Sequence, residues 1–528
     1  MPFSSVKRNR EPERKATIME SKSEASVKAT GGIHRRQFLK TAAGAAGLAC
    51  LPGHVWAGGA PAILPVKNPN SKLQIGVIGL GGISGGHLLG LARDEHLVAL
   101  CDCYPERITA KLDYIKDFDV NNVEPADMKQ FVDYREMLSQ MEGKLDGVVV
   151  CTPDHNHAVI GIDCMKRGIH VFIEKPFAHN IHEAYALRDA ARQYGVAAAQ
   201  GNEGHTFEHV RRTIEVLASG MLGPVREAYH WCAMRSIGGA EQGLNNEPMT
   251  SVDERYRLWS VPVPEDTAFV RYKYGEGAGT DELSKWYWGW HADRRFGSGS
   301  IGDWAVHITD SAYCGLRIGE APGWKVESVE RLFGGDRLHY KMEVYRWTVP
   351  ARAEMPPLEV YWHAGLRPNP EVEVTNEFGK TVKAEFNMPQ KALALQQKHD
   401  YKLPTEGGLY IGEKGSMVVN GYSCMMAFFP RELTRELEAV PKVLPRIEVP
   451  RRVSSNRGEW YHAIRTGEPA TTNFDYASGY AEFYLSALLA SRARVGESVE
   501  YDRVNRRIPT HPELEKFLSR EYRKGYEI

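Results

Sequence analysis

Residues 73–84 read LQIGVIGLGGIS and decide the fold of this chain. The apolar run at 73–78 predicts a buried strand, and residues 87–92 can continue as a helix after the glycine turn. Glycines let the backbone turn tightly and approach a pyrophosphate, which then lies at the positive N-terminus of the helix. This order of elements predicts a dinucleotide site. We expect it to be lined by Gly79, Gly81, Gly82 and Ile83.

An acidic residue follows the glycine turn at the expected distance. The next apolar run, residues 97–101, ends at Asp102, and a carboxylate about twenty positions after the turn accepts hydrogen bonds from the ribose hydroxyls. Ser84 stands where the usual pattern has a third glycine, and it is small enough for close helix–strand packing. The cofactor is expected to be NAD, because no arginine directly follows Asp102. Arg107 is near enough to leave NADP as the alternative.

Length and composition agree with a cofactor-binding enzyme of several domains. The chain has 528 residues, 42% hydrophobic, with a net charge of −1, so it can hold two or three domains. The balanced charge gives no electrostatic reason to expect nucleic acid. Eight cysteines in this length do not indicate a disulfide scaffold. Cys101 and Cys103 lack a second cysteine–histidine cluster that would complete a zinc site.

The N-terminal 57 residues are expected to be a disordered leader and an export signal. Residues 1–32 are polar and aperiodic. Arg35 and Arg36 then precede Phe38-Leu39-Lys40, a weakly apolar run at 41–51 and a small-residue cleavage site at 55–57. This resembles a twin-arginine signal, and it predicts contact with the twin-arginine export machinery and a periplasmic or other extracytoplasmic location. The alternative is an accidental arginine pair before an alanine-rich helix.

Two details of this segment stay open. The apolar run is too short and too rich in Gly and Ala to span a bilayer. Cys50 stands where a lipoprotein cysteine could, but Gly47 matches that pattern poorly, so a soluble product is favoured. Met19 is an alternative start. Residues 58–72 are expected to be a linker.

Strands and helices alternate over residues 73–203. After the glycine turn, apolar runs at 145–151, 169–173 and 196–200 alternate with helical stretches at 159–167 and 181–194. This order predicts a Rossmann domain with a doubly wound parallel sheet, which binds ligands at the carboxyl ends of its strands. Four polar residues follow strand ends and should gather near the glycine turn: Thr152, His157, Lys175 and Asn202.

Residues 204–528 have a different pattern. Alternating runs at 225–231, 326–332, 344–349 and 358–363 predict a second α/β domain with a large, mostly antiparallel open sheet. A hairpin is expected at 408–415, and helices at 459–464 and 479–491 should pack back on the core. Residues 234–297 have few regular signals and are interpreted as an elaborated substrate loop.

A polar helix face is predicted at residues 299–310. Asp303, His307 and Asp310 stand at i, i+4 and i+7, so a regular helix would place them on one face. Two carboxylates and an imidazole suit acid–base chemistry, because histidine titrates near neutrality and a carboxylate can orient it. The alternative is structural, since Ser300 and Asp303 have the spacing of a capping box.

The combined motifs resemble the Gfo/Idh/MocA oxidoreductases. The resemblance rests on the glycine turn, on the TPDHNHA segment at 152–158, on Glu174-Lys175-Pro176 and on residues 299–310; segments at 459–460 and 473–477 resemble exported members. It implies NAD(P)-dependent chemistry on sugars, inositols or related polyols. It also implies a homo-oligomer, because the open sheet of this family often makes subunit contacts.

The resemblance also implies roles for individual residues. Lys175 would polarise the reacting hydroxyl, His307 would remove its proton, and Asp303 would position the histidine. Substrate contacts are expected from Lys175, His307, Asp310 and Trp290, the last lying in the aromatic run 286–290. Cofactor contacts are expected from Thr152, Asp154, His157, Glu174, Lys175 and Asn202. No metal is expected at Asp154, His155 and His157, since two histidines on a loop are a weak ligand pattern. A solvated lysine is the structural alternative for Lys175.

The leading functional hypothesis is an exported oxidoreductase that transfers a hydride between a carbohydrate or polyol hydroxyl carbon and a nicotinamide. Export removes the chain from the cytoplasmic cofactor pool, so the nicotinamide should be non-dissociable. The first alternative is a redox-neutral glycosidase acting by transient oxidation and elimination. The second is a nucleotide-bound sensor without catalysis. The particular sugar, the carbon attacked and the number of subunits are not specified by the sequence.

Overall fold

The computed structural model describes residues 71–118, 128–233, 246–249, 251–272, 289–375, 381–450 and 453–528. The predicted leader and signal at 1–57, including Met19 and Cys50, lie outside the described residues, as does all but the end of the linker. Residues 286–288 of the aromatic run also lie outside them. In the part of the chain that is described, no helix combines the length and apolar character that a membrane span needs.

The glycine turn follows the central strand of a parallel sheet. The strands run in the order β3-β2-β1-β4-β5-β6, and neighbouring strands pair in parallel. Their bounds are β1 Gln74–Ile78, β2 His96–Cys101, β3 Lys129–Phe131, β4 Gly147–Val150, β5 His170–Ile173 and β6 Ala198–Gln200. The order reverses between β1 and β4, which is the switch point where such sheets bind ligands.

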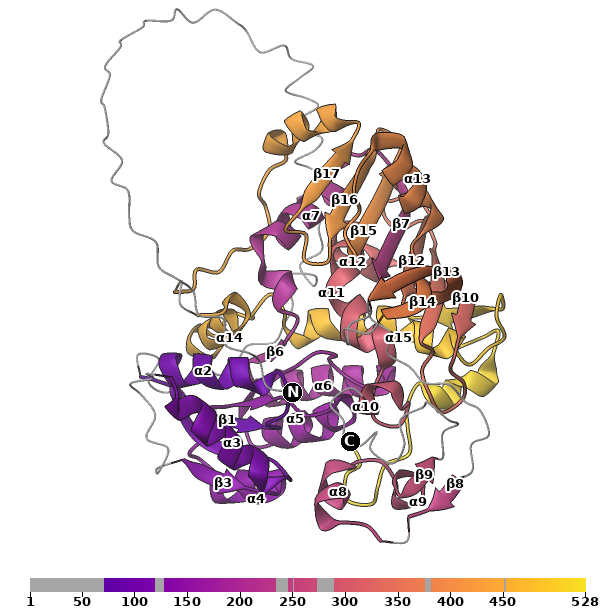
Figure 1. The fold of residues 1–528 in the computed structure, drawn as a ribbon. Coiled ribbons are helices and arrows are strands. Elements are labelled where there is room, and N and C mark those ends of the chain that lie inside the picture. Colours follow the sequence, from indigo (N-terminus) through magenta and orange to yellow (C-terminus); the bar gives the residue numbers. More distant parts are fainter. Residues whose placement is uncertain are drawn as a thin grey trace, which may run out of the picture. The chain divides into compact units, whose positions relative to one another are not determined.

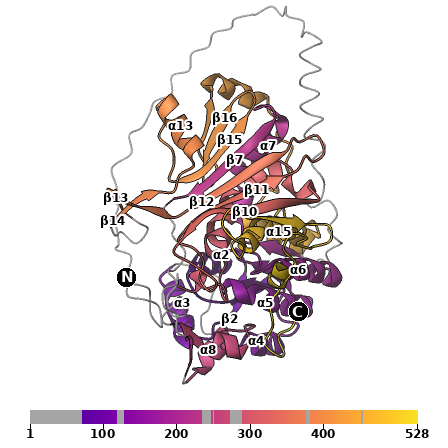
Figure 2. The same cartoon turned by 90° about the vertical axis from the view of Figure 1, so that its right-hand side faces the viewer.

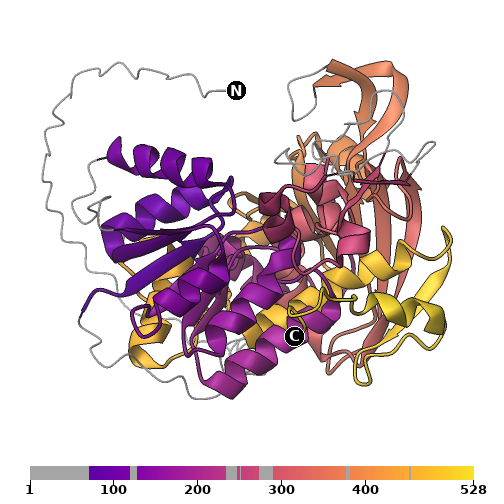
Figure 3. The same cartoon turned by 90° about the horizontal axis from the view of Figure 1, so that it is seen from below.

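Helices cover both faces of this sheet (Figure 3). One face packs against α2 Ser84–Asp94, α3 Pro105–Lys116 and α14 Ser455–Thr466. The other face packs against α4 Tyr134–Gln140, α5 His157–Met165 and α6 Ile181–Tyr194. Figure 1 shows the late helix α14 beside α2. Trp460 of α14 is fully buried, lies edge-on to Phe172 of β5 and donates to the carbonyl of Ala197 at 3.2 Å. The C-terminal part of the chain thus completes the Rossmann core.

The second sheet has eight strands in the order β17-β16-β15-β7-β12-β11-β10-β18. Only the pair β7–β12 is parallel among these strands (Figure 2). The bounds are β7 Val225–Cys232, β10 Gly323–Leu332, β11 Met342–Val349, β12 Leu358–Ala364, β15 Glu406–Gly412, β16 Ser416–Asn420, β17 Met426–Phe429 and β18 Ser498–Asp502. The predicted fold class is therefore confirmed: a Rossmann sheet and a mostly antiparallel α/β sheet.

Shorter elements connect these layers. Two small antiparallel sheets pair β13 Leu366–Thr375 with β14 Thr381–Phe386 and β8 Asn246–Pro248 with β9 Val270–Tyr272. The remaining helices are η2 Asp154–Asn156, η3 Glu203–Thr206, α7 Glu208–Ser219, α8 Glu254–Trp259, α9 Glu265–Ala268, α10 Gly289–Ala292, η4 Ile301–Ala305, α11 Val306–Ile308, α12 Asp310–Gly315, η5 Ile318–Glu320, α13 Gln390–His399, η6 Arg431–Ala439, α15 Phe474–Ala490 and η7 Pro512–Phe517. The domain boundary expected at 203/204 stays a prediction, and η3 crosses it.

One face of the second sheet holds the site segment in place. Trp324 and Trp347 are buried there, and both indoles donate to Ser486 of α15 at 2.9 Å. Trp362 of β12 donates to the Ser300 hydroxyl at 3.1 Å, and that hydroxyl in turn donates to Glu343 of β11. Ser300 directly precedes η4, so the sheet fixes the start of the segment that was predicted to carry the acid–base residues.

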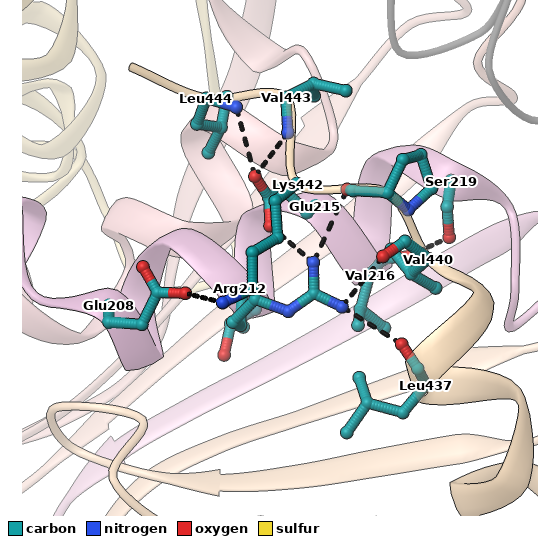
Figure 4. Close-up of polar contacts among 12 residues, drawn as sticks. Glu208, Arg212, Glu215, Val216, Ser219, Leu437, Val440, Lys442, Val443 and Leu444 are labelled. Carbon is teal, nitrogen blue, oxygen red and sulfur yellow. Dashed lines mark hydrogen bonds and ion pairs between the residues drawn. The ribbon is translucent and has the colours of Figure 1, made fainter. Parts of the chain in front are cut away.

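A buried carboxylate ties the segment after η6 to α7 (Figure 4). Glu215 of α7 is fully buried and accepts from the amides of Val443 and Leu444 at 2.8 and 3.0 Å. Arg212 and Arg446 contact the same carboxylate at 2.6 and 2.9 Å. Burial alone would raise the pKa of Glu215, but these hydrogen bonds outweigh burial and hold the pKa below its usual value. The carboxylate therefore stays ionised inside the fold.

Candidate active site

A cavity of about 470 Å³ opens at the carboxyl ends of β1, β2, β4 and β5. The Rossmann domain contributes the glycine turn, Asp102, Thr152, Glu174 and Lys175 to its wall, and the later chain contributes Trp259, Trp290, His291, Asp303 and Trp304. Its size is in the range of small-molecule and cofactor sites. Of the four strand-end residues predicted to gather here, Thr152 and Lys175 line the cavity.

The glycine turn is shaped for a close approach by a ligand. Gly79 has φ +87°, and a Cβ there would lie 2.7 Å from backbone atoms of Cys151 and Thr152. At Gly81, in contrast, there is free space for a side chain, because a Cβ would meet no protein atom within 4 Å. The space beside Gly81 belongs to the cavity. Helix α2 begins at Ser84 without a side-chain cap, so no side chain occupies its positive N-terminus, where a phosphate can lie.

Asp102 joins the glycine turn to the end of β2. Its carboxylate accepts from the amides of Leu80 at 2.7 Å and Tyr104 at 2.9 Å. Burial raises the pKa of Asp102 above its usual value, although nearby Arg107 and these amides act in the opposite direction. A carboxylate offers about four acceptor positions, so acceptor capacity remains for a ribose. Arg107 lies 3.7 Å from the same carboxylate and also lines the cavity.

These features fit a dinucleotide. Gly81 and Asp102 both line the cavity, and α2 starts directly after Ile83, which lines it as well. They correspond to the needs of a pyrophosphate and a ribose. Lys175 lies on the same wall.

Lys175 and Asp303 form a pair on that wall. The Lys175 ammonium donates to Asp303 Oδ1 and, at 3.2 Å, to the Asp303 carbonyl. Burial opposes ionisation of Asp303, but the attraction of Lys175 outweighs it and lowers the pKa of Asp303 to about 2. The sequence led us to expect that Asp303 would orient His307. The structure instead pairs Asp303 with the lysine.

His307 lies behind this pair. Its Nδ1 is 3.1 Å from Asn202 Oδ1, and its ring packs on Trp304 and Tyr422 with centroids 6.1 and 5.3 Å apart. Burial, followed by the charge of Lys175, lowers the pKa of His307 to about 4, so the imidazole is neutral at neutral pH. His307 is not part of the cavity lining, although Lys175 and Asp303 are near enough to act on its pKa.

The segment carrying these residues is not the regular helix that the spacing predicts. Residues 301–305 form a π-helical turn, α11 follows, and Thr309 separates it from α12. Ser300 does not cap the turn, so the capping-box alternative is wrong. A π turn bonds i to i+5 and breaks the 3.6-residue period. Asp310 consequently lies outside the cavity lining and contacts His205 at 2.8 Å.

The other predicted cofactor residues divide into two groups. Thr152 and Glu174 line the cavity, and Glu174 is bonded to His87 of α2 at 2.7 Å. His157 lies behind the wall, with its ring nitrogens 2.8 Å from the carbonyls of Thr152 and Pro176. Asp154 and Asn202 are also buried outside the lining, and burial raises the pKa of Asp154 to about 7. These three residues are placed to shape the wall rather than to line it.

The expected substrate side has one described aromatic of the predicted run, Trp290, which lines the cavity and stacks on His291 with centroids 3.6 Å apart. Sequence reasoning missed Trp304 and Trp259 as wall residues. It also missed Tyr422, which reaches His307 from the turn between β16 and β17. A hairpin turn more than a hundred residues from His307 carries no local signal for this contact.

A cluster with metal-ligand spacing exists elsewhere in the described chain. Ligand atoms of His205, Asp310 and Cys314 lie within 4.8 Å of one another and are buried. They are already joined by hydrogen bonds, since Asp310 contacts both His205 and Cys314. At His155, which we considered as a ligand, the ring nitrogens face the carbonyls of Phe296 and Trp259 at 3.2 and 2.9 Å.

A family model matches the first domain. Residues 73–201 match the GFO_IDH_MocA family, described as an oxidoreductase family with an NAD-binding Rossmann fold. A similar solved structure is the WlbA dehydrogenase from Bordetella pertussis in complex with NADH and UDP-GlcNAcA. It is 14% identical with a TM-score of 0.50, and the alignment covers 81% of this chain and 98% of that one. This likeness shows a shared fold.

Curated relatives share part of the chain. Glycosyl hydrolase family 109 protein 2 of Akkermansia muciniphila is 27% identical over 238 residues, which are 39% of this chain and 48% of that protein. Glycosyl hydrolase family 109 protein 1 of Shewanella sp. (strain MR-4) is 30% identical over 176 residues, 30% of this chain and 37% of that protein. The chain thus spans less than half the length of these relatives.

Proposed function

We propose, on the premise that residues 73–201 are a Gfo/Idh/MocA oxidoreductase domain with an NAD-binding Rossmann fold, that this chain is an NAD-dependent oxidoreductase acting on a CH–OH group of a carbohydrate or polyol. The observation that carries the proposal is the Lys175–Asp303 pair on the wall of the cavity that begins at the glycine turn. A cation at that place can bind a reacting hydroxyl beside the cofactor.

We assign Lys175, Asp303 and His307 one role each in this reaction. The nicotinamide, when bound, supplies a hydride acceptor. Lys175 donates a hydrogen bond to the substrate oxygen, lowers the pKa of that hydroxyl and stabilises developing alkoxide. Asp303 holds the ammonium in place. We assign His307 the role of accepting the hydroxyl proton, because it is neutral, with a pKa of about 4, and lies next to Lys175 and Asp303, which line the cavity.

The substrate class follows from the other walls. Trp290 and Trp304 offer aromatic faces in the cavity, and such faces pack on the apolar side of a pyranose while polar edges meet its hydroxyls. The ligand named for the WlbA dehydrogenase structure, UDP-GlcNAcA, is of the same sugar class. We propose NAD rather than NADP, because Asp102 lines the cavity and has acceptor capacity left for ribose hydroxyls; Arg107, which also lines it, keeps NADP as the alternative.

A second candidate is a redox-neutral glycosidase. It is favoured by the names of the curated relatives, which are glycosyl hydrolase family 109 proteins. Transient oxidation of one hydroxyl, with its hydride passing to the bound nicotinamide, would acidify the neighbouring C–H. The leaving group would then be eliminated, water would add to the resulting double bond, and the stored hydride would return to the carbonyl. Lys175 and His307 would serve both routes, because each route begins with the same hydroxyl.

Export and assembly belong to this proposal. The paired arginines at 35–36 and the apolar run after them support a twin-arginine signal and an extracytoplasmic location. An exported chain needs a cofactor that stays bound through turnover. A homo-oligomer through the open sheet is proposed from the family resemblance.

One experiment separates the candidates. The purified full chain is analysed for bound nucleotide and is then incubated with free sugars, polyols and aryl glycosides while the absorbance band of the reduced cofactor is recorded. Lasting reduction supports the dehydrogenase, and release of the aryl group without net reduction supports the glycosidase. If nucleotide is bound but neither occurs, the chain is a binding protein and the proposed function is wrong.

A further inference from the structure

A chain of hydrogen bonds runs from His307 into the interior of the second domain. His307 Nδ1 lies 3.1 Å from Asn202 Oδ1, and Asn202 Nδ2 donates to the Tyr476 hydroxyl at 3.4 Å. That hydroxyl donates to Asp310 Oδ1, and Asp310 Oδ2 lies 2.8 Å from His205 Nδ1. Each of these side chains is buried.

The carboxylate fixes the direction of every bond in this chain. The Tyr476 hydroxyl donates to Asp310 Oδ1, so toward Asn202 its oxygen remains available only as an acceptor. Burial, followed by the charge of Asp310, raises the pKa of Tyr476, so the phenol retains its proton. The Asn202 amide therefore turns its NH₂ group toward Tyr476 and its carbonyl toward His307.

The amide orientation decides the tautomer of the imidazole. The carbonyl oxygen of Asn202 has no proton to donate. The proton of a neutral His307 must therefore lie on Nδ1, and the lone pair must lie on Nε2. In a neutral histidine, the hydrogen bond made by one ring nitrogen decides which of the two nitrogens carries the proton.

We propose that Asn202, Tyr476 and Asp310 are positioning residues that lock His307 in the Nδ1–H tautomer and leave Nε2 as its proton acceptor. This inference deepens the proposed function, on which it rests for the proton that is moved. Asp310, expected from sequence to contact substrate, becomes the anchor of the chain.

An amide at position 202 leaves the charge around His307 unchanged, whereas a carboxylate there would add a negative charge. The charged groups that act most on His307 are Lys175 and Glu174, just after β5, Asp303 on η4 and Asp310 on α12, while Tyr422 packs on its ring. Asn202 adds no charge to this set. A carboxylate at position 202 would touch the ring and favour the imidazolium.

Helix α15 supports the segment at a second point. Tyr480, one turn after Tyr476, donates to the carbonyl of Val306 at 2.9 Å and lies 2.9 Å from the Thr309 hydroxyl. Tyr480 thus holds the backbone around His307, while Tyr476 acts on the imidazole through Asn202. Both contacts come from a helix about 170 residues later in the sequence.

The test measures the tautomer directly. The full chain is labelled with ¹⁵N-histidine, and the His307 signals are identified by their loss in His307→Gln. Wild type should show Nδ1 protonated and Nε2 unprotonated at neutral pH. Tyr476→Phe removes one hydroxyl and should give a mixture of tautomers, with kcat lowered roughly tenfold and KM unchanged. Tyr484→Phe changes another buried tyrosine of α15 that lies outside this chain of hydrogen bonds, and it should keep the wild-type tautomer of His307.

A second variant keeps the test decisive if Tyr476→Phe does not fold. Asn202→Asp should raise the pKa of His307 by more than one unit, seen both in the ¹⁵N titration and as a shift of the acid limb of kcat/KM to higher pH. An Nε2–H tautomer in wild type, or an unchanged tautomer in Tyr476→Phe, would overturn the inference. The NMR result does not depend on turnover, so absence of activity on every carbohydrate would refute the proposed function alone.

Discussion

Replacing Gly81 by alanine should separate ligand binding from folding. The new Cβ would meet no protein atom within 4 Å, and Gly81 has no positive φ that an alanine would strain. The free energy of unfolding should therefore change by no more than about 0.5 kcal/mol, as for other unobstructed surface positions. The methyl group nevertheless projects where the cavity wall must let a pyrophosphate approach the backbone.

The loss of NAD affinity in Gly81→Ala can be estimated from the free-energy cost of placing an extra methyl group in a tightly packed contact. One extra methyl group in a tightly packed place costs about 1–3 kcal/mol, which corresponds to a dissociation constant for NAD raised roughly 5- to 150-fold. Gly79→Ala should behave differently. It combines a φ of +87° with backbone atoms 2.7 Å from the new Cβ, so it should destabilise the fold by about 2–5 kcal/mol.

The assay pairs calorimetric titration of NAD with denaturant unfolding of the same preparations. Gly86→Ala is the matched control, because a Cβ there also meets no atom within 4 Å but Gly86 does not line the cavity. It should bind NAD like wild type and gain up to about 1 kcal/mol of stability from helix propensity. If Gly81→Ala binds NAD as tightly as Gly86→Ala does, the dinucleotide does not approach this turn and our reading of the cavity is refuted.

Three further outcomes are expected. Lys175→Met should lower kcat on an accepted substrate by roughly 100-fold or more while NAD still binds; exposed Lys144→Met is the control, and equal turnover in both would remove Lys175 from the mechanism. Burial holds the pKa of His155 at about 3 and that of His307 at about 4 in the folded state, below the unfolded value. The folded state therefore binds fewer protons, and the free energy of unfolding should fall as the pH drops from about 6.5 to 4; Asp154, with a pKa of about 7, acts in the opposite sense and reduces this fall. A free energy of unfolding in urea that stays constant across this pH range would contradict the prediction. Glu215→Gln should cost about 1–3 kcal/mol, because the buried carboxylate that accepts from two backbone amides and two arginines loses its charge, whereas Glu413→Gln, in an exposed pair with Arg226, should cost less than about 1 kcal/mol by the same measurement.

The local patterns of the sequence predicted the Rossmann half of the fold well. A buried strand, a glycine turn and Asp102 form a continuous stretch, so their geometry follows from short-range periodicity and backbone freedom. The alternating runs likewise predicted the strands β7, β10, β11 and β12, because each has one face on the core.

The site needed information that no local pattern holds. The i, i+4, i+7 spacing assumed a regular helix, but a π turn at 301–305 rotates Asp310 away from Asp303. The end of that turn is supported by Tyr480, which lies far along the chain and donates to the carbonyl of Ala305 at 3.2 Å. The pairing of Asp303 with Lys175 spans 128 residues. Contacts of this kind depend on how the two sheets meet, which periodicity does not encode.

The most direct test of the central claim is a crystal structure of the full chain with NAD. We predict the pyrophosphate on the amides at 79–83 and the start of α2, a ribose at Asp102, and the nicotinamide ring beside Lys175. A structure with the adenine end beside Lys175, or with the cavity filled by protein side chains after NAD soaking, would contradict the account.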